Sequence, residues 1–328
     1  MRAVVGQALG APENYHLVEV EAPTPPAGCV RIRVAAVGVS FVDVLIAAGG
    51  YQMKPPTPFV PGSGFSGVID AVGEEVPVSR IGERVSATHF GGGFAEHAIA
   101  FAQAALVVPD DMPLDVAAIF PGNYATAHYA LAYRAMLRLG ETVLVLGAAG
   151  NVGLAAIEVG KALGARVIAS ASSAAKRELA LASGADAAID SGASDWRDQV
   201  KALTQGRGAD VVVDPVGGEA TERAFRSLAW NGRLLVVGFA EGAIPRVPAN
   251  LALLKGASLV GVDLRQFAEK EPAQAAANVS AVFALYQQGK LGLRIDRRFA
   301  LADFREAMHA STDRSGVGRV LIEVASGL

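Results

Sequence analysis

The sequence predicts a two-domain α/β protein, in which a doubly wound parallel sheet accompanies a mostly antiparallel, barrel-like domain. Three observations lead to this prediction: a length of 328 residues, a regular series of strands in the middle of the chain, and a different pattern of apolar segments and turns on both sides of that series. A chain of this length is too long for one simple core. We expect the parallel-sheet domain over residues 123–262 and the barrel-like domain over residues 1–122 together with 263–328.

The first 122 residues alternate short apolar segments with turns rich in proline and glycine. Short strands separated by such residues are typical of antiparallel sheets and barrels. Prolines at 55, 56, 58 and 61 predict a shaped loop rather than regular structure. The expected strands are residues 1–5, 31–37, 67–72, 84–87 and 95–100.

The middle of the chain has the regular spacing of βα units. A helix is expected over residues 124–139, and helical segments fill most of the gaps between the strands that follow. Those strands begin 21 to 25 residues apart, near Thr142, Arg166, Ala187, Ala209, Gly232 and Ala257. This rhythm predicts a doubly wound sheet of six parallel strands, which is a complete dinucleotide-binding domain.

After Val262 the sequence pattern resembles that of the first 122 residues again. A helix is expected over 272–288, followed by a strand over 295–299 and a short helix over 303–309. A last strand is expected over 319–324. We expect these last strands to rejoin the first domain and to make it discontinuous.

A glycine-rich turn, residues 147–153, joins the first strand of the parallel sheet to a helix. Glycine allows the backbone to turn tightly and to approach a pyrophosphate, whose charge then lies on the N–H groups at the helix start. An ordinary turn is the alternative, but it does not account for the strand and helix on either side. The predicted cofactor residues in this turn are Ala149, Gly150, Asn151, Val152 and Gly153.

The second strand of this sheet, residues 166–170, is followed by serines and lysine rather than by an acid. An NAD enzyme places a carboxylate there for the ribose hydroxyls, whereas a 2′-phosphate needs hydroxyl and cationic donors. Ser172 and Lys176 therefore favour NADPH as the cofactor. The alternative is a serine-capped helix on which Lys176 and Arg177 are merely solvated.

Short motifs along nearly the whole chain occur together in one order and spacing. They are residues 38–43, 50–51, 58–62, 82–85, 92–96, 126–127, 147–153, 184–186, 214–217, 238–239 and 313–320. Their order resembles that of the zinc-free quinone oxidoreductases of the medium-chain dehydrogenase/reductase superfamily. The resemblance implies a GroES-like barrel for the catalytic domain and a Rossmann fold for the parallel-sheet domain.

Three positions depart from the family pattern. Ser40 stands where the family usually has an asparagine near the nicotinamide, and Gly64 stands where it has a glutamate. Ser191 occupies the place of a tyrosine that often packs near the adenosine phosphate. These departures bear on substrate and cofactor contacts rather than on the fold.

We expect no metal site. Zinc-dependent relatives have a cysteine in place of Ser40 and Gly-His-Glu in place of residues 62–64, and they often carry a four-cysteine loop that a single Cys29 does not allow. His89 and His97 are conceivable ligands, but packed or solvated histidines are commoner. Without a metal to stabilise an alkoxide, hydride transfer needs an acceptor that delocalises its own negative charge. Quinones and enones do so, and NADPH-dependent reduction of such conjugated carbonyls is the predicted function.

Tyr51 and Ser40 are the predicted catalytic residues. Tyr51, on a loop rich in proline and glycine, is a candidate donor of a hydrogen bond or proton to the substrate, and an aromatic wedge is the equal alternative. Ser40 is expected to position nicotinamide or substrate, while Asp43 is expected to hold its segment in place. Phe41, Phe59 and Phe90 are candidates for a flat pocket or for the core.

Four further residues are predicted to bind the cofactor. The resemblance implies that Thr126 contacts it, with a helix N-cap as the alternative. Gly238 and Phe239 follow a strand of the parallel sheet and should border the nicotinamide, since ligands bind at the carboxyl ends of such strands. Arg314 resembles a family residue that reaches the adenosine end, with a surface ion pair as the alternative.

Composition and charge limit the other functions. The net charge of -3 offers no basic face for nucleic acid. The uncharged stretch 142–157 is shorter than a membrane span, and an acid at position 13 argues against a signal peptide, so we expect a cytoplasmic protein. An apolar edge strand over 257–262 predicts a homodimer. An enoyl-thioester reductase and a non-catalytic NADPH-binding protein are the alternative functions.

Overall fold

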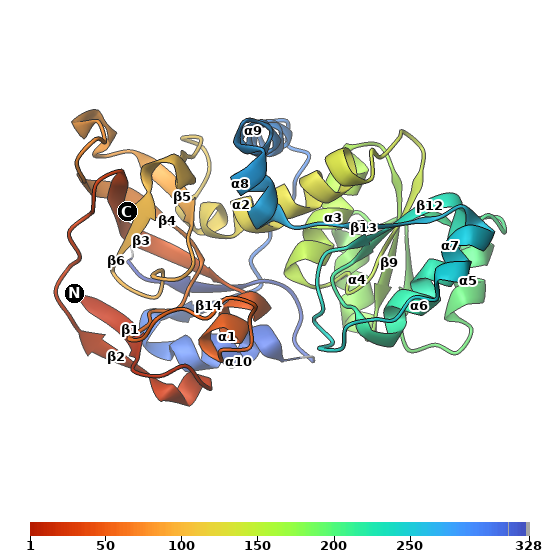
Figure 1. Ribbon diagram of the computed structural model, residues 1–328, viewed down its shortest axis with the longest axis horizontal. Helices are drawn as coiled ribbons and strands as arrows, with labels where there is room; N and C mark the ends of the chain where they lie inside the picture. Colours follow the sequence, from red (N-terminus) through yellow and green to blue (C-terminus); the bar gives the residue numbers. More distant parts are fainter. Residues whose placement is uncertain (314, 326–328) are drawn as a thin grey trace. The chain divides into compact units, whose positions relative to one another are not determined.

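The computed structural model describes residues 1–313 and 315–325, and the chain divides into two compact units (Figure 1). The first unit comprises Met1–Gly122 and the described part of Leu293–Leu328, and the second comprises Asn123–Gly292. Residues 263–292 therefore lie in the second unit, whereas the sequence suggested a boundary after Val262. The reason is packing: the Phe267 ring stacks on Tyr129 with centroids 3.9 Å apart, and Asn278 Nδ2 donates to the Ala125 carbonyl at 3.0 Å.

The second unit contains a six-stranded sheet whose neighbouring strands are all parallel, in the order β10-β9-β8-β11-β12-β13. This confirms the doubly wound sheet and the spacing of its strands. The fifth strand begins four residues earlier than Gly232, because Leu228 already pairs with Ala209 before a bulge. The strands are β8 (Thr142–Val145), β9 (Arg166–Ala171), β10 (Ala187–Asp190), β11 (Ala209–Asp214), β12 (Leu228–Val236) and β13 (Ser258–Gly261).

Helices of the second unit cover this sheet (Figure 1). The apolar side chains between them form a buried core. α3 packs against β8 and β9, α4 against β9 and β10, and α6 against β11 and β12. The helices are α3 (Asn151–Ala162), α4 (Ala174–Ala182), α5 (Trp196–Leu203), α6 (Gly218–Arg226), α7 (Ala249–Lys255), α8 (Leu264–Lys270) and α9 (Pro272–Gln287).

The first unit is built on a mostly antiparallel sheet in the order β14-β15-β3-β4-β5-β7, with β6 also paired to β3 and a separate β1-β2 pair. Ile322 of β15 pairs with Val37 of β3, so the last strand joins the first part of the chain as expected. The strands are β1 (Arg2–Gly6), β2 (Tyr15–Glu19), β3 (Cys29–Val39), β4 (Gly64–Val72), β5 (Arg84–Thr88), β6 (His97–Phe101), β7 (Ala105–Val107), β14 (Arg297–Ala300) and β15 (Val320–Glu323).

The remaining helices of the first unit are short, apart from its share of α2. They are α1 (Phe41–Ala47), α10 (Phe304–Thr312) and single 3₁₀ turns at Pro12–Asn14, Val78–Arg80, Ala102–Ala104 and Leu301–Asp303. The large buried side chains Phe65, Phe94 and Phe304 fill the core between these elements and the sheet.

α2 (Leu114–His128) begins ten residues before the helix expected over 124–139, and a π-helical segment, Tyr129–Arg134, follows it. The expected start was wrong because Pro121 resembled a boundary, whereas it lies inside the helix. Residues 124–134 are helical as expected. Proline has no N–H to offer the carbonyl four residues earlier, which belongs to Ala117. The buried Ser86 hydroxyl donates to that carbonyl at 2.6 Å and makes the interior proline tolerable.

Candidate active site

Four loops gather at the carboxyl edge of the parallel sheet, because β9, β8, β11 and β12 are consecutive neighbours. From β8 the chain proceeds to β9 and β10 on one side and returns to β11 and β12 on the other. Ligands of open α/β sheets bind at such a reversal of strand order. The predicted residues Ser172 and Gly238 therefore lie on the same edge as the turn 147–153.

The turn after β8 fits a pyrophosphate. Gly150 is the extended N-cap of α3, and no side chain caps this helix. The N–H groups of the first helical turn, at Asn151, Val152 and Gly153, have no acceptors within the helix. A Cβ on Gly153 would lie 2.3 Å from the Gly147 carbonyl oxygen, so only glycine permits the close approach of strand and helix. Backbone N–H groups and the helix dipole are thus available for an anion.

The loop after β9 presents hydroxyl groups and cations rather than acids. Ser173, not Ser172, caps α4 by accepting from the Lys176 N–H at 3.4 Å, and Ser172 is exposed. Arg177 pairs with Asp190, the last residue of β10, at 3.0 Å, so this carboxylate already has a cationic partner. The serine cap of the alternative interpretation exists, but it does not use Ser172.

A buried aspartate orders the loops that follow β11 and β12. The Asp214 carboxylate accepts from the N–H groups of Val216 and Gly217, each at 2.9 Å, and from the Thr221 hydroxyl at 2.5 Å. The Asp214 carbonyl accepts from the Gly238 N–H at 3.3 Å. Phe239 follows, with 37% of its surface exposed. The sequence motif included Asp214 but did not identify this role.

Thr126 lies half-buried in the interior of α2, so the alternative of an N-terminal cap is wrong. Arg314 lies outside the described residues.

In the first unit, Asp43 joins the start of α1 to the loop before β4. Its Oδ2 accepts from the Ser40 N–H and hydroxyl at 2.8 and 2.5 Å, and its Oδ1 accepts from the Ser63 N–H and hydroxyl at 2.7 and 2.6 Å. Asp43 is buried, whereas both serines are half-buried. A structural role for Asp43 was expected from the sequence, but Ser63 was not identified as a partner of the same carboxylate.

The far end of α1 is anchored by Tyr15. The Tyr15 hydroxyl donates to the Ala47 carbonyl at 2.9 Å, and Tyr15 is fully buried. Burial raises the pKa of this phenol to about 12, so it stays a donor. The helix that carries Asp43 is therefore fixed at both ends.

Aromatic side chains lie beside this polar network. The rings of Tyr51 and Phe90 are tilted, with centroids 5.9 Å apart, and both pack on the core of the unit. Phe90 also lines a small recess together with Phe59, Asp43 and Ser63. Phe90 therefore lies next to Tyr51 and also lines the recess that contains Ser63. Tyr51 has the packing role of an aromatic wedge and carries a hydroxyl group.

Gly64, which stands where the family usually has a glutamate, lies close to α2. Gly64 of β4 pairs with Gly38 of β3, and both strands approach α2. A Cβ on either glycine would lie 3.2 Å from the Ala118 carbonyl oxygen, which is tighter than most real contacts. A larger side chain at position 64 would therefore push α2 away.

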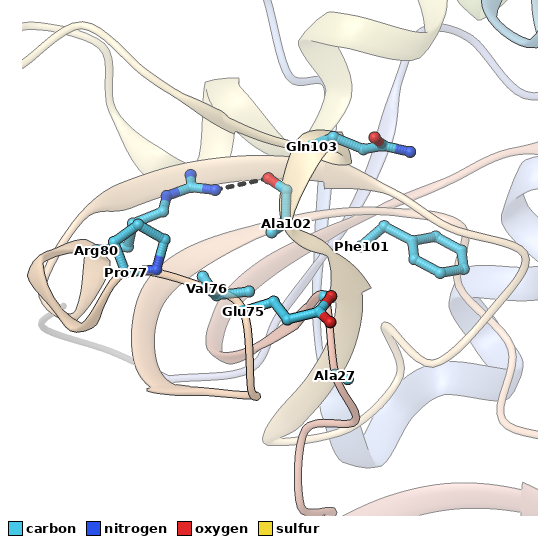
Figure 2. A pocket seen from close by; sticks show the side chains of 9 residues that line it. Ala27, Glu75, Val76, Pro77, Arg80, Phe101, Ala102 and Gln103 are labelled. Carbon is cyan, nitrogen blue, oxygen red and sulfur yellow. Dashed lines mark hydrogen bonds between the residues drawn. The ribbon is translucent and has the colours of Figure 1, made fainter.

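A larger pocket of about 500 Å³ in the first unit is a separate feature (Figure 2). Its lining contains none of the predicted site residues. Arg80 at its wall donates to the Ala102 and Ala105 carbonyls at 2.6 and 2.8 Å and pairs with Glu83 at 2.7 Å. These bonds give Arg80 a structural role.

Metal-binding groups are scarce at these positions. Within residues 1–313 and 315–325, no three side chains of histidine, cysteine, aspartate or glutamate form a group that would hold a metal ion. His97 Nε2 pairs with Asp70 at 3.1 Å, and His89 Nδ1 lies 3.1 Å from the Gly91 carbonyl.

No helix within residues 1–313 and 315–325 has the length and apolar character needed to cross a membrane.

Comparison with known proteins identifies both units. The family model "Alcohol dehydrogenase GroES-like domain" matches residues 26–110, and "Zinc-binding dehydrogenase" matches residues 151–281. The "Quinone oxidoreductase-like protein 2 homolog" of Nematostella vectensis is 36% identical over 326 residues, covering 98% of this chain and 88% of the relative.

Two solved structures are similar over nearly their whole length. A mycobacterial protein complexed with NADPH superposes with a TM-score of 0.91 at 31% identity, covering 99% of this chain and 100% of the other. CurK enoyl reductase superposes with a TM-score of 0.88 at 26% identity, with 99% of each chain covered.

Replacing Gly153 by alanine should damage the anion site, because the added Cβ would lie 2.3 Å from the Gly147 carbonyl oxygen and would displace the turn. We expect dinucleotide binding to weaken by about tenfold or more, equivalent to about 1.4 kcal/mol. Fluorescence titration of the reduced dinucleotide measures this. The matched control is Gly192→Ala, where the nearest contact would be an ordinary 3.4 Å. Unchanged affinity in Gly153→Ala would exclude the turn as the pyrophosphate site.

Proposed function

The chain belongs to the zinc-free quinone oxidoreductase family of the medium-chain dehydrogenase/reductase superfamily, and on this premise we propose that it reduces quinones or related conjugated carbonyl compounds. It is an NADPH-dependent reductase of that family. NADPH supplies a hydride when bound, and a proton completes the reaction: a quinone becomes a hydroquinone, an enone becomes a saturated ketone, and NADP⁺ is released.

The observation that carries the proposal is the Ser40–Asp43–Ser63 network beside an aromatic pair. Serine hydroxyls that donate to a carboxylate are not the thiolate and imidazole donors that zinc needs. A carbonyl that is polarised only by hydrogen bonds must spread the incoming negative charge itself, and a conjugated acceptor does so. The neighbouring Tyr51 and Phe90 rings suit a flat, unsaturated substrate.

We assign roles to the site residues on the same basis. The Tyr51 hydroxyl donates a hydrogen bond or a proton to the substrate oxygen, and Ser40 orients the nicotinamide or the substrate. The turn 149–153 binds the pyrophosphate, and Ser172 with Lys176 binds the 2′-phosphate. Thr126, Gly238, Phe239 and Arg314 complete the proposed cofactor contacts.

Reduction of an enoyl thioester is the second candidate, and the similarity to CurK enoyl reductase favours it. The hydride chemistry is the same, because the thioester carbonyl also delocalises charge through the double bond. The two candidates differ in the acceptor, which turnover measurements separate.

We predict rapid oxidation of NADPH, followed by its absorbance, with 1,4-benzoquinone, 9,10-phenanthrenequinone or a simple enone. NADPH should be preferred to NADH. Lys176→Ala should raise the KM for NADPH by about tenfold through loss of a charge-assisted hydrogen bond and leave that for NADH unchanged. Arg207→Ala, which removes an exposed arginine, is the matched control.

Three results would contradict these assignments. Turnover of an enoyl thioester but of no quinone or enone would select the second candidate. NADPH binding without turnover of any acceptor would identify a non-catalytic NADPH-binding protein. A preference for NADH would refute the role of Ser172 and Lys176.

We further propose that the chain forms a homodimer in the cytoplasm. β13 is an edge strand of the parallel sheet, and edge strands offer unpaired backbone groups to another chain. Large apolar side chains near it are exposed, with 70% of Trp230, 80% of Leu253 and 54% of Leu259 accessible. A second copy pairing with β13 would cover this surface.

Charge placed on that surface should dissociate the dimer. The variant Leu259→Lys should sediment as a monomer, because the new ammonium group would be buried in the interface. Leu181→Lys, at an exposed leucine of α4, is the control and should stay dimeric. A wild-type monomer in sedimentation velocity, or a dimeric Leu259→Lys variant, would contradict the proposed interface.

A further inference from the structure

Asp43 determines the direction of two hydroxyl groups. A carboxylate only accepts hydrogen bonds, and a serine hydroxyl has a single proton. The Ser40 and Ser63 hydroxyls lie 2.5 and 2.6 Å from the two Asp43 oxygens, so both protons lie toward Asp43. Each serine oxygen therefore presents only lone pairs to a ligand.

Ser63 is the better placed of the two for contact with a substrate. It lines the recess that Phe90 and Phe59 also line, and Phe90 packs against Tyr51. The Ser40 oxygen already accepts from the Asp43 N–H at 3.3 Å, which uses part of its acceptor capacity.

We infer that Ser63 is a specificity-determining residue, which selects conjugated acceptors that carry a hydrogen-bond donor on the ring, such as hydroxyalkyl quinones. The inference rests on the proposed function. A bare quinone offers only carbonyl oxygens, and two acceptors do not pair. A hydroxyl on the ring donates to Ser63, while the reducible carbonyl stays available to Tyr51. Asp43 acts through Ser63 and is a positioning residue.

The test compares two quinones that differ in one hydroxyl, hydroxymethyl-1,4-benzoquinone and methyl-1,4-benzoquinone. The measured quantity is the ratio of their kcat/KM values with NADPH. Ser63→Ala should lower this ratio by about fivefold, the effect of one neutral hydrogen bond. Ser63→Thr keeps the hydroxyl and should restore the ratio. A change that merely disturbs the fold would lower both rates and leave the ratio unchanged.

Two further variants keep the test decisive. Ser63→Cys is nearly isosteric and a weak acceptor, so it should also lower the ratio if the alanine variant does not fold. Asp43→Asn adds an amide donor, which allows one hydroxyl to turn outward, and should lower the ratio with Ser63 in place. An equal ratio in wild type, Ser63→Ala and Ser63→Cys would overturn the inference while the quinone activity stands. No turnover of either quinone by the wild type would instead refute the proposed function.

Discussion

The site of the first unit depends on the hydrogen bonds that the buried carboxylate of Asp43 accepts. Burial of an unpaired carboxylate costs several kcal/mol, so the surrounding structure must supply donors. Ser40 and Ser63 supply them with both their N–H and hydroxyl groups, from the start of α1 and from the loop before β4. One carboxylate thus fixes two loops and the orientation of their hydroxyls. The orientation of these polar groups follows directly from the packing of the unit.

The site of the second unit depends instead on a close approach between two backbone segments, the end of β8 and the start of α3. Gly153 lets α3 start against the end of β8, and this leaves the first N–H groups of the helix for an anion. Asp214 orders the neighbouring loops with three hydrogen bonds of its own. Both units therefore use a buried aspartate to hold loops, and in neither case does the aspartate itself need to face a ligand.

Local patterns predicted much of this structure, and long-range pairing explains what they missed. The spacing of apolar segments predicted six parallel strands, because each βα unit is a local feature. The start of α2 was misplaced because a hydrogen bond from Ser86, a residue of a distant strand, accommodates Pro121 inside the helix. Ser63 was missed for the same reason: the antiparallel register of β3 and β4 brings it to Asp43. The end of the second unit depended on Phe267 stacking on Tyr129, which spacing alone does not reveal.

In the proposed reaction, hydride passes directly from NADPH to a conjugated acceptor whose own delocalisation stabilises the charge. This direct transfer is tested with NADPH that carries deuterium in place of the transferred hydrogen on C4 of the nicotinamide. The reaction also contains a simple enone and a zinc chelator. We expect turnover that the chelator does not slow, with deuterium on the carbon β to the product carbonyl. Product without deuterium at that carbon, or loss of turnover in the chelator, would contradict it.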